Sequence, residues 1–135
     1  MSIRTSFSER LGLRLPLIAA PMAGGPTTPE LVAACSAAGA LGSFGFAYTQ
    51  PEEMKKQAAS VRAKTDRPFG INLFVSPQPE AIDAVHQSAA LAALAPWYAE
   101  MGLAAPEAAR PPFAPDLKAQ LAAVEEIKPP QDPAK

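Results

Sequence analysis

The sequence predicts an α/β fold built on a parallel sheet, and the pattern that predicts it lies in the first 75 residues. Three short apolar segments alternate there with two segments of helical periodicity. About twenty residues separate one apolar segment from the next, which is too long for a hairpin turn and suits a helical crossover to a parallel strand. The first apolar segment, Leu17–Ala20, is apolar at every position, as in a strand that is covered on both faces. Nothing in the pattern favours an antiparallel sandwich.

The first crossover has clear start and stop signals. A helix should begin at Thr27 or Thr28, whose hydroxyl can cap it, with Pro29 in the first turn, where its missing N–H costs nothing. Gly39 stands where a glycine commonly ends a helix. A second strand is then expected over Ala40–Phe44. The apolar face of this helix should be formed by Leu31, Val32 and Cys35.

The second crossover begins at a predicted capping box, Thr49–Glu52. We expect Glu52 and Lys56 to pair on the surface of the helix that follows, because they are four residues apart. The third strand is expected over Phe69–Val75. The buried face of the second helix should contain Met54, Ala58 and Val61.

The second half of the chain is rich in alanine and proline. An alanine-rich helix is expected over Glu80–Ala95, with Pro96 interrupting it before a short helical piece that Gly102 can close. Residues 103–115 should form an extended connection, and Asp116 should cap a final helix whose apolar positions are Leu117, Leu121 and Val124. We therefore predict three regions, which are β/α units over 1–75, a helical insertion over 76–130 and a polar tail over 131–135.

Composition excludes several classes of protein. A chain of 135 residues with 48% hydrophobic residues fits one globular domain, and a net charge of −1 gives no electrostatic case for binding nucleic acid or an anionic membrane. Cys35 is the single cysteine, so no internal disulfide can form and a reducing compartment fits. Pro16 and Pro21 limit the apolar N-terminal stretch to a length below that of a signal peptide or membrane span. Cytoplasmic localisation is expected.

Two features of the sequence are candidates for binding a ligand. The small-residue turn Ala20–Gly25 follows the first strand, and it is either a tight loop or a backbone platform for a planar ligand; from spacing alone the two are equal. Its Met22 is either core filler or a soft contact to an aromatic ring. Asn72 lies in an apolar strand, where a buried unpaired amide would cost about 1–3 kcal/mol. We favour ligand contact over a structural role for Asn72.

Other residues have simpler explanations. The glycines at 39, 42 and 45 lack the spacing and context of a dinucleotide-binding loop, so no phosphate site is predicted there. His86 should be a partly covered helix residue, since it has no catalytic partner at useful spacing, and Cys35 should be inert packing on the apolar face of its helix. No metal-ligand spacing is present.

Seven segments of the chain form a recognisable set, and they are Leu15–Gly25, Thr28–Ala34, Gly39–Gly45, Pro68–Val75, Pro77–Ala81, Trp97–Gly102 and Pro111–Pro115. In this order and spacing, they together resemble the flavin-dependent nitronate monooxygenases, once called 2-nitropropane dioxygenases. One departure from the family pattern is Ala19, where many relatives have glutamine.

The resemblance implies a TIM barrel that binds FMN non-covalently at the carboxyl ends of its strands and oxidises alkyl nitronates with O2. In the family the Ala-Pro-Met-Ala turn lies against the isoalloxazine ring and the asparagine of strand three bonds the cofactor. Carried over, these roles fall on Pro21, Met22, Ala23 and Asn72. The family's active-site histidine and its phosphate-binding glycines come later than the segments matched here, so no catalytic residue is assigned.

The implied architecture is a partial TIM (β/α)8 barrel, consisting of the first three parallel β/α units plus a helical insertion. A closed barrel needs about 250 residues, so we expect a truncated product that is inactive alone and has open sheet edges. Within the same class, the alternative is a fragment of a flavin-dependent enoyl reductase-like barrel. A different alternative is a non-catalytic α/β module that self-associates, or binds another protein, through those edges.

Overall fold

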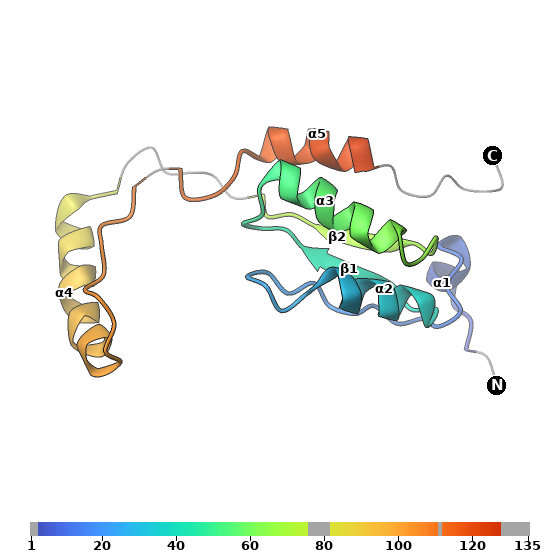
Figure 1. Ribbon diagram of the computed structural model, residues 1–135, viewed down its shortest axis with the longest axis horizontal. Coiled ribbons are helices and arrows are strands. Elements are labelled where there is room, and N and C mark those ends of the chain that lie inside the picture. The colour runs from blue at the N-terminus through green and yellow to red at the C-terminus, as the bar shows by residue number, and fades with distance from the viewer. Residues whose placement is uncertain (1–2, 76–81, 111, 128–135) are drawn as a thin grey trace. The chain divides into compact units, whose positions relative to one another are not determined.

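The computed structural model describes residues 3–75, 82–110 and 112–127 (Figure 1). They form two compact units, one made of 3–75 and 115–127 and the other of the intervening residues. Within the described residues, no helix combines the length and apolar character needed to cross a membrane. The elements in chain order are α1 (Ser6–Arg10), α2 (Pro29–Ala37), β1 (Gly42–Gly45), α3 (Pro51–Arg62), β2 (Phe69–Asn72), α4 (Ala84–Glu100) and α5 (Leu117–Ile127).

The first unit confirms the α/β prediction and the parallel sheet. β1 and β2 pair in parallel, with Gly42 opposite Phe69 and Gly45 opposite Asn72. Both strands are shorter than predicted, because hydrogen bonding extends only over these four pairs. β1 begins at Gly42 rather than at Ala40, and β2 ends at Asn72 rather than at Val75. Beyond Asn72, Phe74 and Val75 are exposed.

The first predicted strand, Leu17–Ala20, is reduced to an isolated parallel bridge between Ile18 and Leu41. Two backbone bonds hold it, from Ala19 N–H to the Leu41 carbonyl and from Leu41 N–H to the Leu17 carbonyl, each 2.9 Å. The predicted direction is therefore right, but the predicted burial is wrong.

The surroundings of this segment explain both its exposure and its short pairing. Leu17 and Ile18 are 58% and 55% exposed, because no described element covers their outer side. Pro21 follows the segment and has no N–H to donate, so hydrogen-bonded pairing ends there, whereas before Pro16 the Leu15 amide still donates to the Gly39 carbonyl at 2.9 Å.

Helix α2 begins and ends as the sequence predicts. Thr28 is its N-cap, and the Thr28 hydroxyl accepts a bond of 3.3 Å from the amide of Leu31. Gly39 has φ = +96°, a backbone conformation that glycine adopts without strain. The guanidinium of Arg14 donates to the carbonyl of Ala38 at 2.8 Å and so satisfies the carboxyl end of the helix.

Helix α3 begins close to its predicted start, but the predicted capping box is wrong. Gln50 is the N-cap and makes no side-chain capping bond. Thr49 belongs to the preceding turn, where its N–H donates to the Phe46 carbonyl at 3.2 Å. The predicted Glu52–Lys56 pair is also replaced, because Glu52 bonds Lys55 at 2.7 Å.

The second unit contains α4, which is continuous through Pro96, where an interruption was predicted. A proline removes one backbone donor, and the surrounding alanines favour the helix strongly enough to continue it. Asp83 is the N-cap and accepts bonds from the amides of Val85 and His86; of the predicted start, residues 80 and 81 lie outside the described residues. Gly102, with φ = +67°, follows the end of the helix as predicted.

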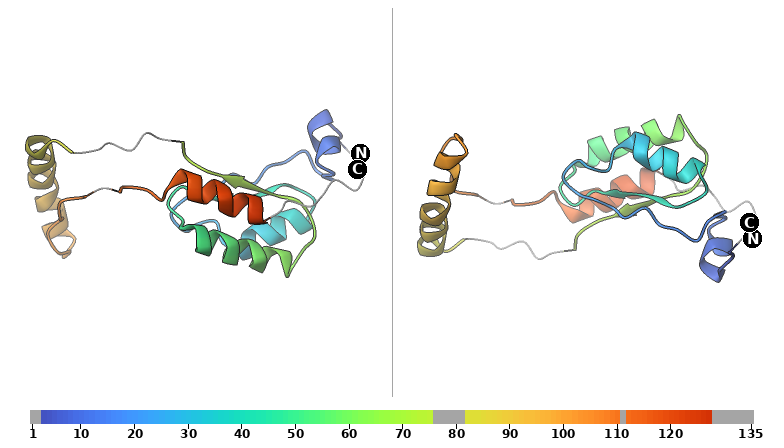
Figure 2. Two further views of the ribbon diagram at one scale, coloured as in Figure 1. Left: turned by 90° about the horizontal axis from the view of Figure 1, so that it is seen from above. Right: turned by 90° about the horizontal axis from the view of Figure 1, so that it is seen from below.

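Helix α5 packs on α3 in the first unit (Figure 2). Asp116 accepts a bond of 3.0 Å from the Lys118 amide, in agreement with its predicted capping role. Leu121, predicted on the apolar face, is 49% exposed, and the buried residues of α5 are instead Gln120 and Ala123. The hydrophobic core joins both helices to α2 and β1 through Val32, Ala33, Phe44, Phe46, Met54, Val61 and Ala123.

Candidate functional site

The candidate site is the edge of the sheet where three chain segments end side by side. The bridge segment, β1 and β2 all run in parallel, so their carboxyl ends meet at the same edge. This edge is where open parallel α/β sheets and barrels commonly hold their ligands. The turn after Ala19, the end of β1 at Gly45 and the end of β2 at Asn72 lie there.

Gly45 is in direct contact with the turn that follows the bridge segment. A Cβ atom placed on Gly45 would stand 2.7 Å from the nitrogen of Ala23 and 2.8 Å from the carbonyl carbon of Met22. The turn therefore lies over the face of β1 toward which a Gly45 side chain would point. Only glycine allows the two backbones to approach so closely.

Asn72 belongs to the same face of the sheet. Residues paired across a parallel ladder point to the same side, and Asn72 is paired with Gly45. Two residues earlier, a Cβ on Gly70 would meet the Ser43 hydroxyl at 2.8 Å, so this next pair also shares one face. The predicted site residues Met22, Ala23 and Asn72 thus come together on the face opposite the Phe44 side of the strand, which packs in the core.

The burial predicted for Asn72 is wrong. Asn72 is exposed, because it is the last residue of β2 and, among the described residues, β2 pairs only with β1. Its carbonyl accepts a bond of 3.0 Å from the Phe46 amide, which fixes the backbone at this point. The cost of burying an unpaired amide therefore does not apply here, and ligand contact by Asn72 stays a prediction.

The turn itself is held in shape by one side chain and two glycines. The Met22 amide donates to the hydroxyl of buried Thr27 at 3.0 Å. Gly24 and Gly25 have φ of +82° and +110°, which other residues rarely adopt. Pro21–Met22 is exposed and Ala23 is half-buried, so backbone and small side chains are presented at the sheet edge.

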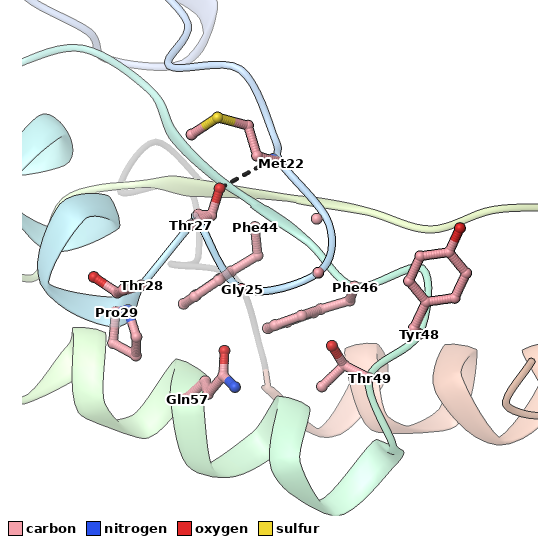
Figure 3. A pocket seen from close by; sticks show the side chains of 12 residues that line it. Met22, Gly25, Thr27, Thr28, Pro29, Phe44, Phe46, Tyr48, Thr49 and Gln57 are labelled. Atoms are coloured by element: carbon pink, nitrogen blue, oxygen red, sulfur yellow. Dashed lines mark hydrogen bonds between the residues drawn. The ribbon is translucent and has the colours of Figure 1, made fainter. Parts of the chain in front are cut away.

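A cavity of about 340 Å³ lies between this turn, the end of β1 and α3 (Figure 3). The rings of Phe44 and Phe46 stack beside it with centroids 4.5 Å apart. Of the four predicted cofactor residues, Met22 lines the cavity, and Pro21, Ala23 and Asn72 do not. The full lining consists of Met22, Gly24, Gly25, Thr27, Thr28, Pro29, Phe44, Gly45, Phe46, Tyr48, Thr49 and Gln57.

Charged groups with shifted pKa values lie on helices rather than at this edge. Hydrogen bonding by its own backbone amide, then by Thr28 and Lys64, holds the pKa of Glu30 below its ordinary value. Hydrogen bonds to Glu52 and then Glu126 raise the pKa of Lys55, which joins α3 to α5. The described residues contain no group of three or more side chains suited to holding a metal ion.

His86 was predicted to be partly covered, and this is wrong. Its side chain is exposed on α4, with Nδ1 at 3.3 Å from a carboxylate oxygen of Asp83. Cys35 is half-buried on α2 and Leu31 is exposed, so of the predicted apolar face only Val32 is buried, together with Ala33 and Ser36.

Sequence reasoning missed Gln120. Its side chain is 2% exposed, and its amide nitrogen donates to the carbonyls of Phe46 and Thr49, each at 2.9 Å. No local signal could identify it, because its partners are 74 and 71 residues away in the sequence.

Known proteins show similarity to most of the chain. Residues 6–133 match the protein family described as "Nitronate monooxygenase". The chain is 40% identical over 100 residues to a nitronate monooxygenase of Pseudomonas aeruginosa, covering 74% of this chain and 28% of the relative. It is 45% identical over 69 residues to a probable nitronate monooxygenase of Bacillus subtilis, covering 51% and 20%.

Solved structures show similarity over the same region. A nitroalkane oxidase from Streptomyces ansochromogenes aligns with a TM-score of 0.72 at 32% identity, over 90% of this chain and 33% of its own. FabK from Thermotoga maritima aligns with a TM-score of 0.52 at 38% identity, over 56% and 24%. The chain thus spans between a fifth and a third of the length of these proteins.

Proposed function

Since this chain belongs to the nitronate monooxygenase family, we propose that it supplies the first part of an FMN-dependent oxidoreductase that oxidises alkyl nitronates with O2. The observation that carries the proposal is the meeting of two sequence-distant features on one face of the sheet edge. These are the Met22–Ala23 turn, whose backbone packs against Gly45, and Asn72, which is the partner of Gly45 in the parallel sheet.

The residues present fit a planar cofactor. The backbone of the turn is exposed at Pro21–Met22, and the methyl group of Ala23 and the bare backbone of Gly24 leave room for a ring to approach. The carboxamide of Asn72 can donate and accept hydrogen bonds, which suits the alternating carbonyl and N–H groups along the pyrimidine edge of a flavin.

In the proposed site, Pro21, Met22 and Ala23 contact the isoalloxazine ring and exclude water from it, and Asn72 orients the ring. FMN, when bound, supplies the redox chemistry, taking electrons from the substrate and passing them to oxygen. Met22 is well suited to ring contact, because it is 44% exposed and a thioether interacts favourably with aromatic systems.

The 135-residue chain alone should hold FMN weakly or not at all, and it should not turn over a nitronate. Pro21, Met22 and Asn72 are exposed, so among the described residues nothing encloses this part of the sheet edge. A visible spectrum of the purified chain after gel filtration with FMN tests this. Stoichiometric flavin absorbance would contradict it.

The competing function is that of a flavin-dependent enoyl reductase-like barrel. The family match over residues 6–133 and the similarity to nitronate monooxygenases favour nitronate oxidation over this alternative.

A chimera tests the two functions directly. The aligned segment of the Pseudomonas relative is replaced by this chain, and the purified product is assayed for flavin content and for oxygen consumption with an alkyl nitronate. A parallel assay supplies an enoyl thioester and a reduced nicotinamide nucleotide. We expect bound FMN and nitronate-dependent oxygen uptake. A folded chimera that lacks flavin, or that reduces only the enoyl thioester, would overturn the proposal.

A further inference from the structure

We propose that Gln120 is a positioning residue that holds the carboxyl end of β1, and through it Asn72, at the sheet edge. The inference rests on the proposed function for its link to the flavin, and on the geometry alone for its link to the sheet edge. Gln120 lies on α5, which follows the second unit in the sequence and packs back onto the first.

The contacts of Gln120 are unusual for a residue on an amphipathic helix. Its side chain is fully buried, and one amide nitrogen donates to two backbone carbonyls at once, those of Phe46 and Thr49. These two residues bracket the turn between β1 and α3. A fixed geometry results, because both donors of one rigid carboxamide group are used.

A continuous series of hydrogen bonds runs from Gln120 to the candidate site. The Phe46 carbonyl accepts from Gln120 at 2.9 Å, and the Phe46 amide donates to the Asn72 carbonyl at 3.0 Å. The same Phe46 carbonyl accepts from the Thr49 amide at 3.2 Å. Phe46 follows Gly45, on which the Met22–Ala23 turn rests. The turn and Asn72 therefore both depend on the backbone that Gln120 holds.

Simple core packing would not require this arrangement. An apolar side chain in place of Gln120 would fill the same space on α5, but it would leave the carbonyls of Phe46 and Thr49 without these donors. The sequence around it, Leu117–Val124, would keep its helical pattern either way. The polar group is thus explained by the turn that it bonds.

The test compares Gln120→Met, which keeps length and volume but has no donor, with Val124→Ala in the same 135-residue chain. Val124 packs against the core from α5 and makes neither bond, so its variant controls for loosened helix packing. Amide hydrogen exchange is measured by NMR on the three proteins, and each is titrated with FMN while the amide signals of Gly45, Phe46 and Asn72 are followed, since such titrations detect weak binding.

We expect Gln120→Met to speed exchange of the Phe46 and Thr49 amides by about 10- to 30-fold over Val124→Ala, and to weaken FMN binding about tenfold. Equal exchange in the two variants would overturn the inference. Faster exchange with unchanged FMN affinity would overturn the link to the flavin. Where the wild-type chain shows no FMN response, faster exchange supports the structural role of Gln120, and the FMN comparison is made in the chimera with the Pseudomonas relative. A folded chimera that binds no FMN would overturn the proposed function and leave the structural role of Gln120 standing.

Gln120→Asn keeps the test decisive if the methionine variant does not fold. It retains the carboxamide but is one methylene shorter, so it cannot reach both carbonyls in the same geometry. The same local increase in exchange is expected, and unchanged protection at Phe46 and Thr49 would overturn the inference.

Discussion

The backbone of Met22 rests directly on Gly45, so closely that a Cβ atom on Gly45 would stand 2.8 Å from the Met22 carbonyl carbon. This contact joins the turn after the bridge segment to the end of β1. Asn72, on the neighbouring strand β2, is paired with the same glycine. Gly45 is therefore the point at which the separate parts of the candidate site meet.

Gly45→Ala should lower the free energy of unfolding by about 1–3 kcal/mol, because the neighbouring atoms belong to backbone that must shift. Gly70→Ala is the matched control, since the atom that its Cβ would meet is the hydroxyl of Ser43, a side chain that can rotate away. Urea unfolding of both variants measures the difference. An alanine at 70 that costs as much as one at 45 would contradict this explanation.

Asn72→Ala should leave the stability of the 135-residue chain within about 0.5 kcal/mol, because the side chain is exposed. In the chimera with the Pseudomonas relative, the same change should weaken FMN binding by about 1–3 kcal/mol, since it removes a hydrogen bond to the cofactor. Fluorescence titration with FMN gives the dissociation constant. Gln50→Ala, which also removes an exposed amide, should leave it unchanged, and an unchanged constant in Asn72→Ala would exclude the contact.

Gln50→Ser should raise the free energy of unfolding by about 0.5–1 kcal/mol. Gln50 occupies the N-cap of α3 in an extended conformation but makes no capping bond, which a serine hydroxyl can supply. Thr28→Ala is the converse change at α2, where the cap is present, and should lower stability by about 1 kcal/mol. Thermal and urea unfolding measure both; a serine variant no more stable than wild type would show that the α3 terminus is satisfied in another way.

Glu30 should contribute stability that disappears in acid. Hydrogen bonding by its own backbone amide, then by Thr28 and Lys64, lowers the pKa of Glu30 in the folded chain below 4.5. The contribution is therefore present above pH 4.5 and is lost as the pH falls through the folded-state pKa.

Glu30→Gln should consequently be less stable than wild type at neutral pH and equal to it in strong acid. Urea unfolding as a function of pH measures the gap between the two proteins. Glu107→Gln, in the second unit, corrects for the loss of one negative charge. A gap that stays constant through the acid range would contradict the assignment.

Local signals predicted much of the first unit. Thr28 and Gly39 mark the ends of α2 because a hydroxyl cap and a left-handed glycine act within a few residues. The spacing of Met54, Ala58 and Val61 predicted the buried face of α3. The capping box at Thr49 failed because that residue bonds the preceding turn, and α4 passed through Pro96 because its alanines favour the helix.

What the sequence determined by itself is the order of the elements, the parallel direction of the strands and the family, because helix signals and crossover lengths are local properties of the chain. The tertiary structure alone decided that the Met22 turn packs against Gly45 and that Asn72, paired with Gly45, is exposed. It also decided that Gln120 bonds the Phe46 carbonyl at the end of β1. The reason is that these relationships join residues far apart in the chain, and no local pattern records which distant backbone a side chain will meet once the helices have packed.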